Sequence, residues 1–175
     1  MKIFRILTLA AVFVASVAAA FAQTNKPIDA VKSFYAYDRT HSQYFSRAAI
    51  DARKKWFSDD LYKLFLYELK RQKEFERKHP NEKTYFGEGL PFKPYDELCT
   101  VGKQKLHKQL SFRPDAEDAN VATVLVTFAF PAPCKEPDNT VYTFQMVKSA
   151  TGWVIDDVIY EKDSNLVTDL KRKDY

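Results

Sequence analysis

The sequence predicts an α+β fold, with helices in its first half and strands in its second half. Between residues 27 and 80, apolar side chains recur at helical spacing. From residue 100 onward they alternate with polar side chains, and the stretch Gly152–Tyr160 is typical of a long closing strand. Because the helices and strands are segregated along the chain, an α+β arrangement is favoured over repeated βαβ units.

Three helices are predicted in the first half. The first begins at Pro27, since proline suits the first helical turn, and ends in the polar stretch 38–43. A short second helix covers 48–57. The third begins after Ser58, a good N-cap that two aspartates follow, and it ends before Pro80.

A long connection, 81–97, follows the helices and predicts a lid or a partner-contacting surface. It carries glycines and prolines among aromatic residues, and connections of this length in compact domains tend to be functional or mobile. Exposed tyrosine and tryptophan are typical of binding surfaces, although most aromatic residues serve a core. The candidate ligand- or partner-binding residues are Tyr85, Phe86, Phe92, Tyr95 and Trp153.

Four strands are predicted at 100–110, 121–130, 141–149 and 152–160, and a short helix at 165–171. The second strand has the clearest alternation. One of its faces is entirely apolar and should pack against the helices, whereas its mixed face could meet solvent or a cavity.

Two cysteines, Cys99 and Cys134, predict a disulfide. If strands 100–110 and 121–130 form a hairpin that turns near 115–117, the two cysteines lie at almost equal distances from the turn. A bond between them would fasten the open end of that hairpin. A lone pair of cysteines in an oxidising compartment is most simply a disulfide, and the alternative is two buried thiols.

The N-terminus predicts a secretory signal peptide over residues 1–22. Lys2 and Arg5 precede an apolar stretch, 6–20, and Ala20-Phe21-Ala22 forms an A-x-A cleavage signature. An uncleaved membrane anchor is the alternative, but the stretch is short for a bilayer span of about 20 residues. We therefore expect a single domain, 23–175, in the periplasm or secreted by a Gram-negative bacterium, with no membrane span after cleavage.

Charge and motifs exclude several function classes. Without the signal peptide the formal net charge falls from +4 to +2, which argues against nucleic acid as the main partner. His41, His79 and His107 lie too far apart in sequence to form a metal-ligand motif, and no nucleophile or phosphate-binding motif is present. We expect no metal and no cofactor.

The adjacent carboxylates Asp156 and Asp157 are the candidate catalytic residues. Strict strand alternation would place Asp157 on the face of Ile155, and Asp156 on the face of Val158. One carboxylate should then meet an apolar environment, which would raise its pKa toward the range that proton transfer needs. A structural carboxylate that accepts hydrogen bonds is the commoner outcome.

Three segments resemble the nuclear transport factor 2-like superfamily, also called SnoaL-like: Ala30–Tyr35, Trp56–Leu61 and Gly152–Tyr160. The order of these segments is similar to that of a bacterial secreted or lipid-anchored branch that is a domain of unknown function. The resemblance implies a cystatin-like cone, in which three helices pack on a curved antiparallel sheet and leave a pocket between them. Superfamily members include isomerases, dehydratases, cyclases, binding modules and dimerisation domains, so the fold leaves function open.

We therefore expect an extracytoplasmic, non-enzymatic binding or protein-interaction module, whose aromatic-rimmed pocket takes a small apolar ligand or a protein of the cell envelope. One alternative is a SnoaL-like pocket enzyme, an isomerase or hydratase/dehydratase that uses Asp157 or Asp156 for proton transfer. A further alternative is a homodimeric assembly domain.

Overall fold

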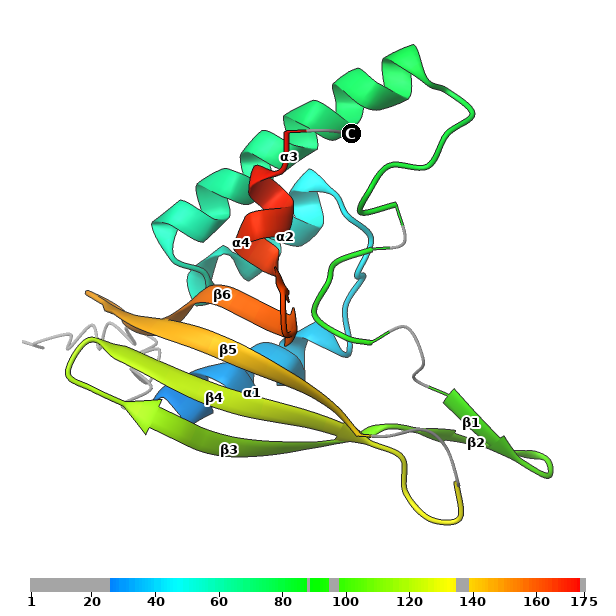
Figure 1. Cartoon of the computed structure of the whole chain (residues 1–175), viewed down its shortest axis with the longest axis vertical. Helices are drawn as coiled ribbons and strands as arrows, with labels where there is room; N and C mark the ends of the chain where they lie inside the picture. The colour runs from blue at the N-terminus through cyan, green and yellow to red at the C-terminus, as the bar shows by residue number, and fades with distance from the viewer. Residues whose placement is uncertain (1–25, 88, 95–97, 135–138, 174–175) are drawn as a thin grey trace, which may run out of the picture.

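The computed structural model describes residues 26–87, 89–94, 98–134 and 139–173, and it shows an α+β fold (Figure 1). The predicted signal peptide lies outside the described residues. The helices are α1 (Pro27–Asp38), α2 (Arg47–Arg53), the 3-10 helix η1 (Lys54–Trp56), α3 (Asp59–Lys78) and α4 (Leu166–Lys171). The strands are β1 (Leu98–Val101), β2 (Gln104–His107), β3 (Gln109–Glu117), β4 (Val121–Ala129), β5 (Thr140–Ser149), β6 (Gly152–Glu161) and β7 (Ser164–Asn165).

The main sheet is antiparallel, curved and ordered β3-β4-β5-β6-β7. Its neighbouring strands are also consecutive in sequence, so short turns can join them. Irregularities in register interrupt the pairing of β3 with β4 and of β5 with β6. Extra residues of this kind increase strand twist and bend a sheet.

The core lies between the inner face of this sheet and the helices. Val124, Val126 and Phe128 of β4 alternate with partly exposed residues, as the sequence predicts, and each is at most 1% exposed. Phe144 of β5 lies next to them and contacts Phe34 of α1, with ring centroids 6.3 Å apart. Helix α1 contacts β3, β4 and β6, so it runs across the sheet and buries its inner face (Figure 1).

Helix α3 begins where the sequence predicts, and its start is attached to the sheet. The Ser58 hydroxyl accepts a hydrogen bond from the Leu61 amide, which satisfies one free donor of the first turn. The Ser58 amide donates to the carbonyl of Ile155 in β6 at 2.8 Å. One residue therefore ends the preceding segment, begins the helix and fixes it to β6.

The prediction of one strand over 100–110 is wrong. Gly102 has a φ of +61°, a conformation that favours glycine, and β1 folds back there onto β2. The resulting two-stranded ribbon projects from the end of the sheet at which β3 begins (Figure 1). β3 then extends through the predicted turn at 115–117, and the chain reverses at 118–120 instead.

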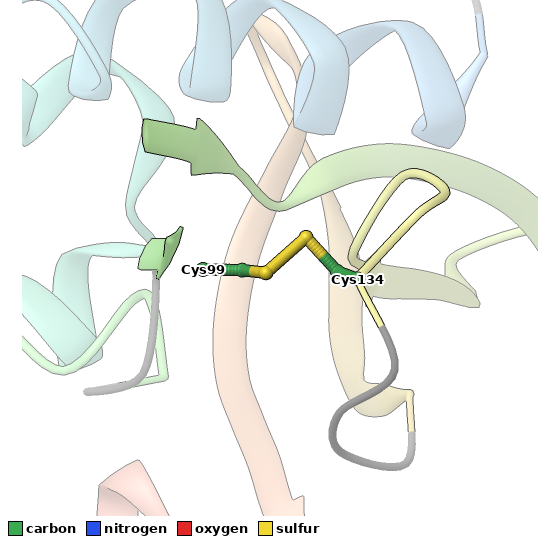
Figure 2. The surroundings of a disulfide bond; sticks show 2 residues. All are labelled: Cys99 and Cys134. Atoms are coloured by element: carbon green, nitrogen blue, oxygen red, sulfur yellow. A yellow bond between two sulfur atoms is a disulfide. The ribbon is translucent and has the colours of Figure 1, made fainter. Parts of the chain in front are cut away.

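The predicted disulfide between Cys99 and Cys134 is confirmed (Figure 2). Their Cα atoms lie 6.2 Å apart. Because the first predicted strand is divided, the bond has a different role from the expected one. It joins β1 of the projecting ribbon to the segment that follows β4, and so fastens the ribbon to the main sheet.

Three helices precede the sheet, as predicted, and α4 follows it. Among the described residues, no helix is both long enough and apolar enough to cross a membrane.

We predict that replacing both cysteines by serine will lower the free energy of unfolding by roughly 4 kcal/mol, because the bond closes a loop across 35 positions of sequence separation. Urea unfolding of the oxidised protein and of the double variant measures this difference. Reductant should lower the stability of the wild type alone. Equal stabilities with and without reductant would contradict the prediction.

Candidate functional site

A pocket of about 770 Å³ lies at one end of the sheet. Thr140 and Tyr142 of β5, Tyr160 of β6 and Asp169 of α4 contribute to one side. The connection between α3 and β1 contributes the other side through residues of 85–94. The pocket therefore forms where segments distant in sequence meet, as is common for small-molecule sites.

The predicted aromatic residues fall into different environments. Tyr85 and Phe86 line the pocket, and Tyr85 is 51% exposed. Phe92 is fully buried against Phe34, and Trp153 is buried in the core away from the residues that line the pocket. Tyr95 lies outside the described residues. The structure thus brings Tyr85 and Phe86 to one site, with Phe86 also packed in the core, and it places Phe92 and Trp153 in the core alone.

The pocket side of the connection is held by backbone contacts. The Leu90 amide donates to the Gln43 carbonyl at 2.7 Å, and the Tyr35 hydroxyl donates to the Phe92 carbonyl at 2.6 Å. Gly89 has a φ of +122°, and a Cβ there would come within 2.9 Å of the Gln43 carbonyl oxygen. Glycine is therefore required at this position, and the connection has a defined path over the sheet.

A buried ion pair supports the segment that supplies Gln43. Arg53 Nε lies 2.7 Å from Asp38 Oδ1, and both side chains are 1% exposed. The remaining guanidinium nitrogens donate to the carbonyls of Ala49 and Ser42, and Gln43 Nε2 donates to the other Asp38 oxygen at 2.8 Å. Burial raises the pKa of Asp38, although the Arg53 hydrogen bond acts in the opposite direction. The hydrogen bonds of Asp38 and Arg53 are therefore made within the protein, and the role of the ion pair is structural.

Tyr160 and Asp169 form a hydrogen-bonded pair in the pocket. The Tyr160 hydroxyl donates to Asp169 Oδ2 at 2.6 Å, and the Tyr160 ring contacts that of Tyr142. Burial and then the bond to Asp169 raise the pKa of Tyr160 above its ordinary value. The phenol therefore stays protonated near neutral pH, and the pair presents a fixed polar edge to the pocket.

A second buried carboxylate, Glu68 of α3, organises the pocket wall. Arg172 Nη2 donates to Glu68 Oε1 at 2.6 Å, and Arg71 Nη1 lies 3.3 Å from Oε2. The Arg172 guanidinium lies 3.7 Å from the centre of the Tyr85 ring, and it also donates to the Asp169 carbonyl. Arg172 therefore connects α3, the aromatic connection and α4.

The acid pair in β6 differs from the expected alternation. Val158 is paired with Phe144 and Ile155 with Met146, all of them buried, although Ile155 and Val158 are three positions apart. A bulge in β6 between these positions makes this possible. The assignment of Asp157 to the face of Ile155 is therefore wrong, because Asp157 is paired with Gln145, the neighbour of Met146, and Asp156 is the extra residue without a pairing partner in β5.

Asp157 is a buried acceptor of backbone hydrogen bonds. Its Oδ1 accepts from the amides of Val158 at 2.7 Å and Val167 at 2.9 Å, and Val167 lies in the first turn of α4. Burial raises the pKa of the Asp157 carboxyl, because desolvation outweighs these two bonds. Asp156 lines a separate hollow of about 370 Å³. Neither aspartate lines the larger pocket.

Sequence reasoning missed Thr140, Tyr142, Tyr160 and Asp169. The two tyrosines lie at the ends of predicted strands, where an inward-facing hydroxyl next to a long connection could have marked a pocket. No sequence signal connected Tyr160 with Asp169. Within the part of the chain that the structure describes, no three His, Cys, Asp or Glu side chains gather as a metal site would require.

Comparisons with protein-family models, with curated proteins and with solved structures found no match to this chain.

We predict that the free energy of unfolding of the wild type will fall, relative to that of Asp157→Asn, as pH rises from about 4. The native state binds the Asp157 proton more tightly than the unfolded state, whose pKa is about 3.9, so stability is lost as pH rises through the raised native pKa. Urea titrations between pH 4 and 7 measure the difference. Asp163→Asn, at an exposed position, is the matched control. The prediction would be contradicted if the free energy of unfolding changed with pH by the same amount in the wild type and in Asp157→Asn.

We also predict that Glu68→Gln will lower the free energy of unfolding by about 3 kcal/mol, because Arg172 and Arg71 lose the carboxylate that neutralises them in a buried site. Chemical denaturation measures the loss. Glu74→Gln, at an exposed position of the same helix, should change stability by less than about 0.5 kcal/mol. Equal effects of the two variants would contradict a structural role for Glu68.

Proposed function

We propose that this protein is an extracytoplasmic, non-enzymatic binding module, and that its aromatic-rimmed pocket captures a small ligand with apolar surface. The observation that carries the proposal is the pocket of about 770 Å³, which has the size of ordinary small-molecule sites. Tyr85, Tyr142, Tyr160 and Phe86 supply aromatic surface, and the tyrosines also supply hydroxyl groups.

The binding role has more support than the enzymatic alternative, in which Asp157 or Asp156 transfers a proton. Asp157 is engaged by two backbone amides, and neither aspartate lines the pocket. The pocket carboxylate Asp169 accepts a hydrogen bond from a phenol whose raised pKa keeps it protonated. Asp169 already accepts this hydrogen bond, and Tyr160 stays protonated near neutral pH. The pair therefore suits ligand recognition better than proton transfer.

The disulfide and the order of the elements support the rest of the proposal. A disulfide is favoured in oxidising compartments, so it supports a periplasmic or secreted location. Helices that precede a curved antiparallel sheet, with a pocket between the sheet and the connection, are compatible with membership of the nuclear transport factor 2-like superfamily. Homodimerisation through the open sheet face is a separate hypothesis, which light scattering tests.

The proposal predicts that the uncharged dye Nile red will bind with one site per chain, and that filling the pocket will abolish this binding. Ser164 lines the pocket, so Ser164→Trp should occupy its volume. Ser111→Trp, at an exposed position of β3, is the matched control and should bind as the wild type does. Fluorescence titration measures the affinity, and circular dichroism verifies that both variants fold. Equal binding by both variants, or no binding by the wild type, would contradict the proposal.

A further inference from the structure

Lys108 is a buried cation that has little to neutralise it. It lies between β2 and β3 and is 4% exposed. Its ammonium donates to the Thr140 hydroxyl at 3.4 Å and lies 5.0 Å from the centre of the Phe130 ring. Within the described ranges, no aspartate or glutamate forms an ion pair with it.

This arrangement is unfavourable without an anion. An ammonium group carries three donors, and here one of them makes a single long bond to a neutral hydroxyl. Lysine is almost never fully buried unless it is paired, because removing its charge from water costs several kcal/mol. The other buried charges described above have opposite charges within 2.7 Å or backbone donors within 2.9 Å. Lys108 therefore differs from every one of them.

The partner of Lys108 connects it to the pocket. Thr140 accepts the bond from Lys108 and is itself one of the residues that line the pocket. Among the described residues, the charged side chains that line the pocket are Lys93, Glu161 and Asp169. Lys108 is not one of the lining residues; it precedes β3 and is joined to the pocket through Thr140. Lys108 thus differs from Lys93 in being buried, with a neutral hydroxyl as its hydrogen-bond acceptor.

We propose that Lys108 is the anion-binding group of this pocket, and that the ligand is a small amphipathic carboxylate whose charged end lies against Lys108 and Thr140. The proposal rests on the proposed binding function and specifies its ligand class. The buried ammonium of Lys108 matches a single negative charge, and the two acidic side chains Glu161 and Asp169, which outnumber the lining cation Lys93, disfavour a doubly charged phosphate. Phe86, Leu90 and the pocket prolines offer apolar surface to the rest of such a molecule.

The test compares two fluorescent probes of nearly equal shape, 11-(dansylamino)undecanoate and its carboxamide. The wild type should bind the carboxylate more tightly than the carboxamide, and Lys108→Met should weaken carboxylate binding roughly 10- to 100-fold, the range for a lost hydrogen bond to a charged group. Carboxamide binding should change little. Lys105→Met removes the same charge from an exposed position of β2 and should leave both affinities as in the wild type.

Each outcome has a distinct meaning. Equal binding of the two probes by the wild type overturns the proposal, whether or not Lys108→Met folds. A carboxylate preference that survives in Lys108→Met also overturns it, and Lys108→Gln provides the same comparison if the methionine variant does not fold. In both cases, continued binding of the carboxamide or of Nile red leaves the proposed binding function in place. Failure of the wild type to bind any of these probes contradicts the binding function itself.

Discussion

The burial of the inner sheet face against α1 is the constraint on which the rest of the structure depends. Helix α1 packs across β3, β4 and β6, and its Phe34 contacts residues from the sheet, η1 and the long connection. At one end of the sheet, inner-face residues such as Tyr142 and Tyr160 instead border an open pocket. The connection after α3 passes over this end, with its Phe92 inserted in the core, so the pocket arises from packing that also stabilises the fold.

Buried charges position the irregular segments around this pocket. Asp38 and Arg53 organise the segment that holds the connection, Asp157 accepts from the start of α4, and Glu68 attaches Arg172 and thereby Tyr85. Each has an oppositely charged or hydrogen-bonding partner within the chain, as buried charges generally require, although Glu68 Oε2 is held only by its ion pair with Arg71. Such groups fix segments for which helix or strand hydrogen bonds are not available. Lys108 differs from these groups, because its hydrogen bond is a long one to a neutral hydroxyl.

The acid pair in β6 shows how a local pattern can indicate chemistry that the packing does not provide. Two aspartates in a buried strand resemble a catalytic pair when alternation is taken as strict. The bulge directs Asp157 to the first turn of α4, where the carboxylate satisfies backbone donors. The polar pair that does line the pocket is Tyr160 with Asp169, and its two members come from a strand and from the helix after it.

The sequence by itself determined most elements, because helical spacing, strand alternation and caps depend on residues a few positions apart. It predicted the start of α3 at Ser58, the buried face of β4 and the bond between Cys99 and Cys134. Only the tertiary structure decided the fold-back at Gly102, the bulge next to Asp157 and the meeting of Lys108 with Thr140. These features depend on strand register and on contacts between distant segments, which are selected by the packing of the whole chain and leave no periodic signal in the local sequence.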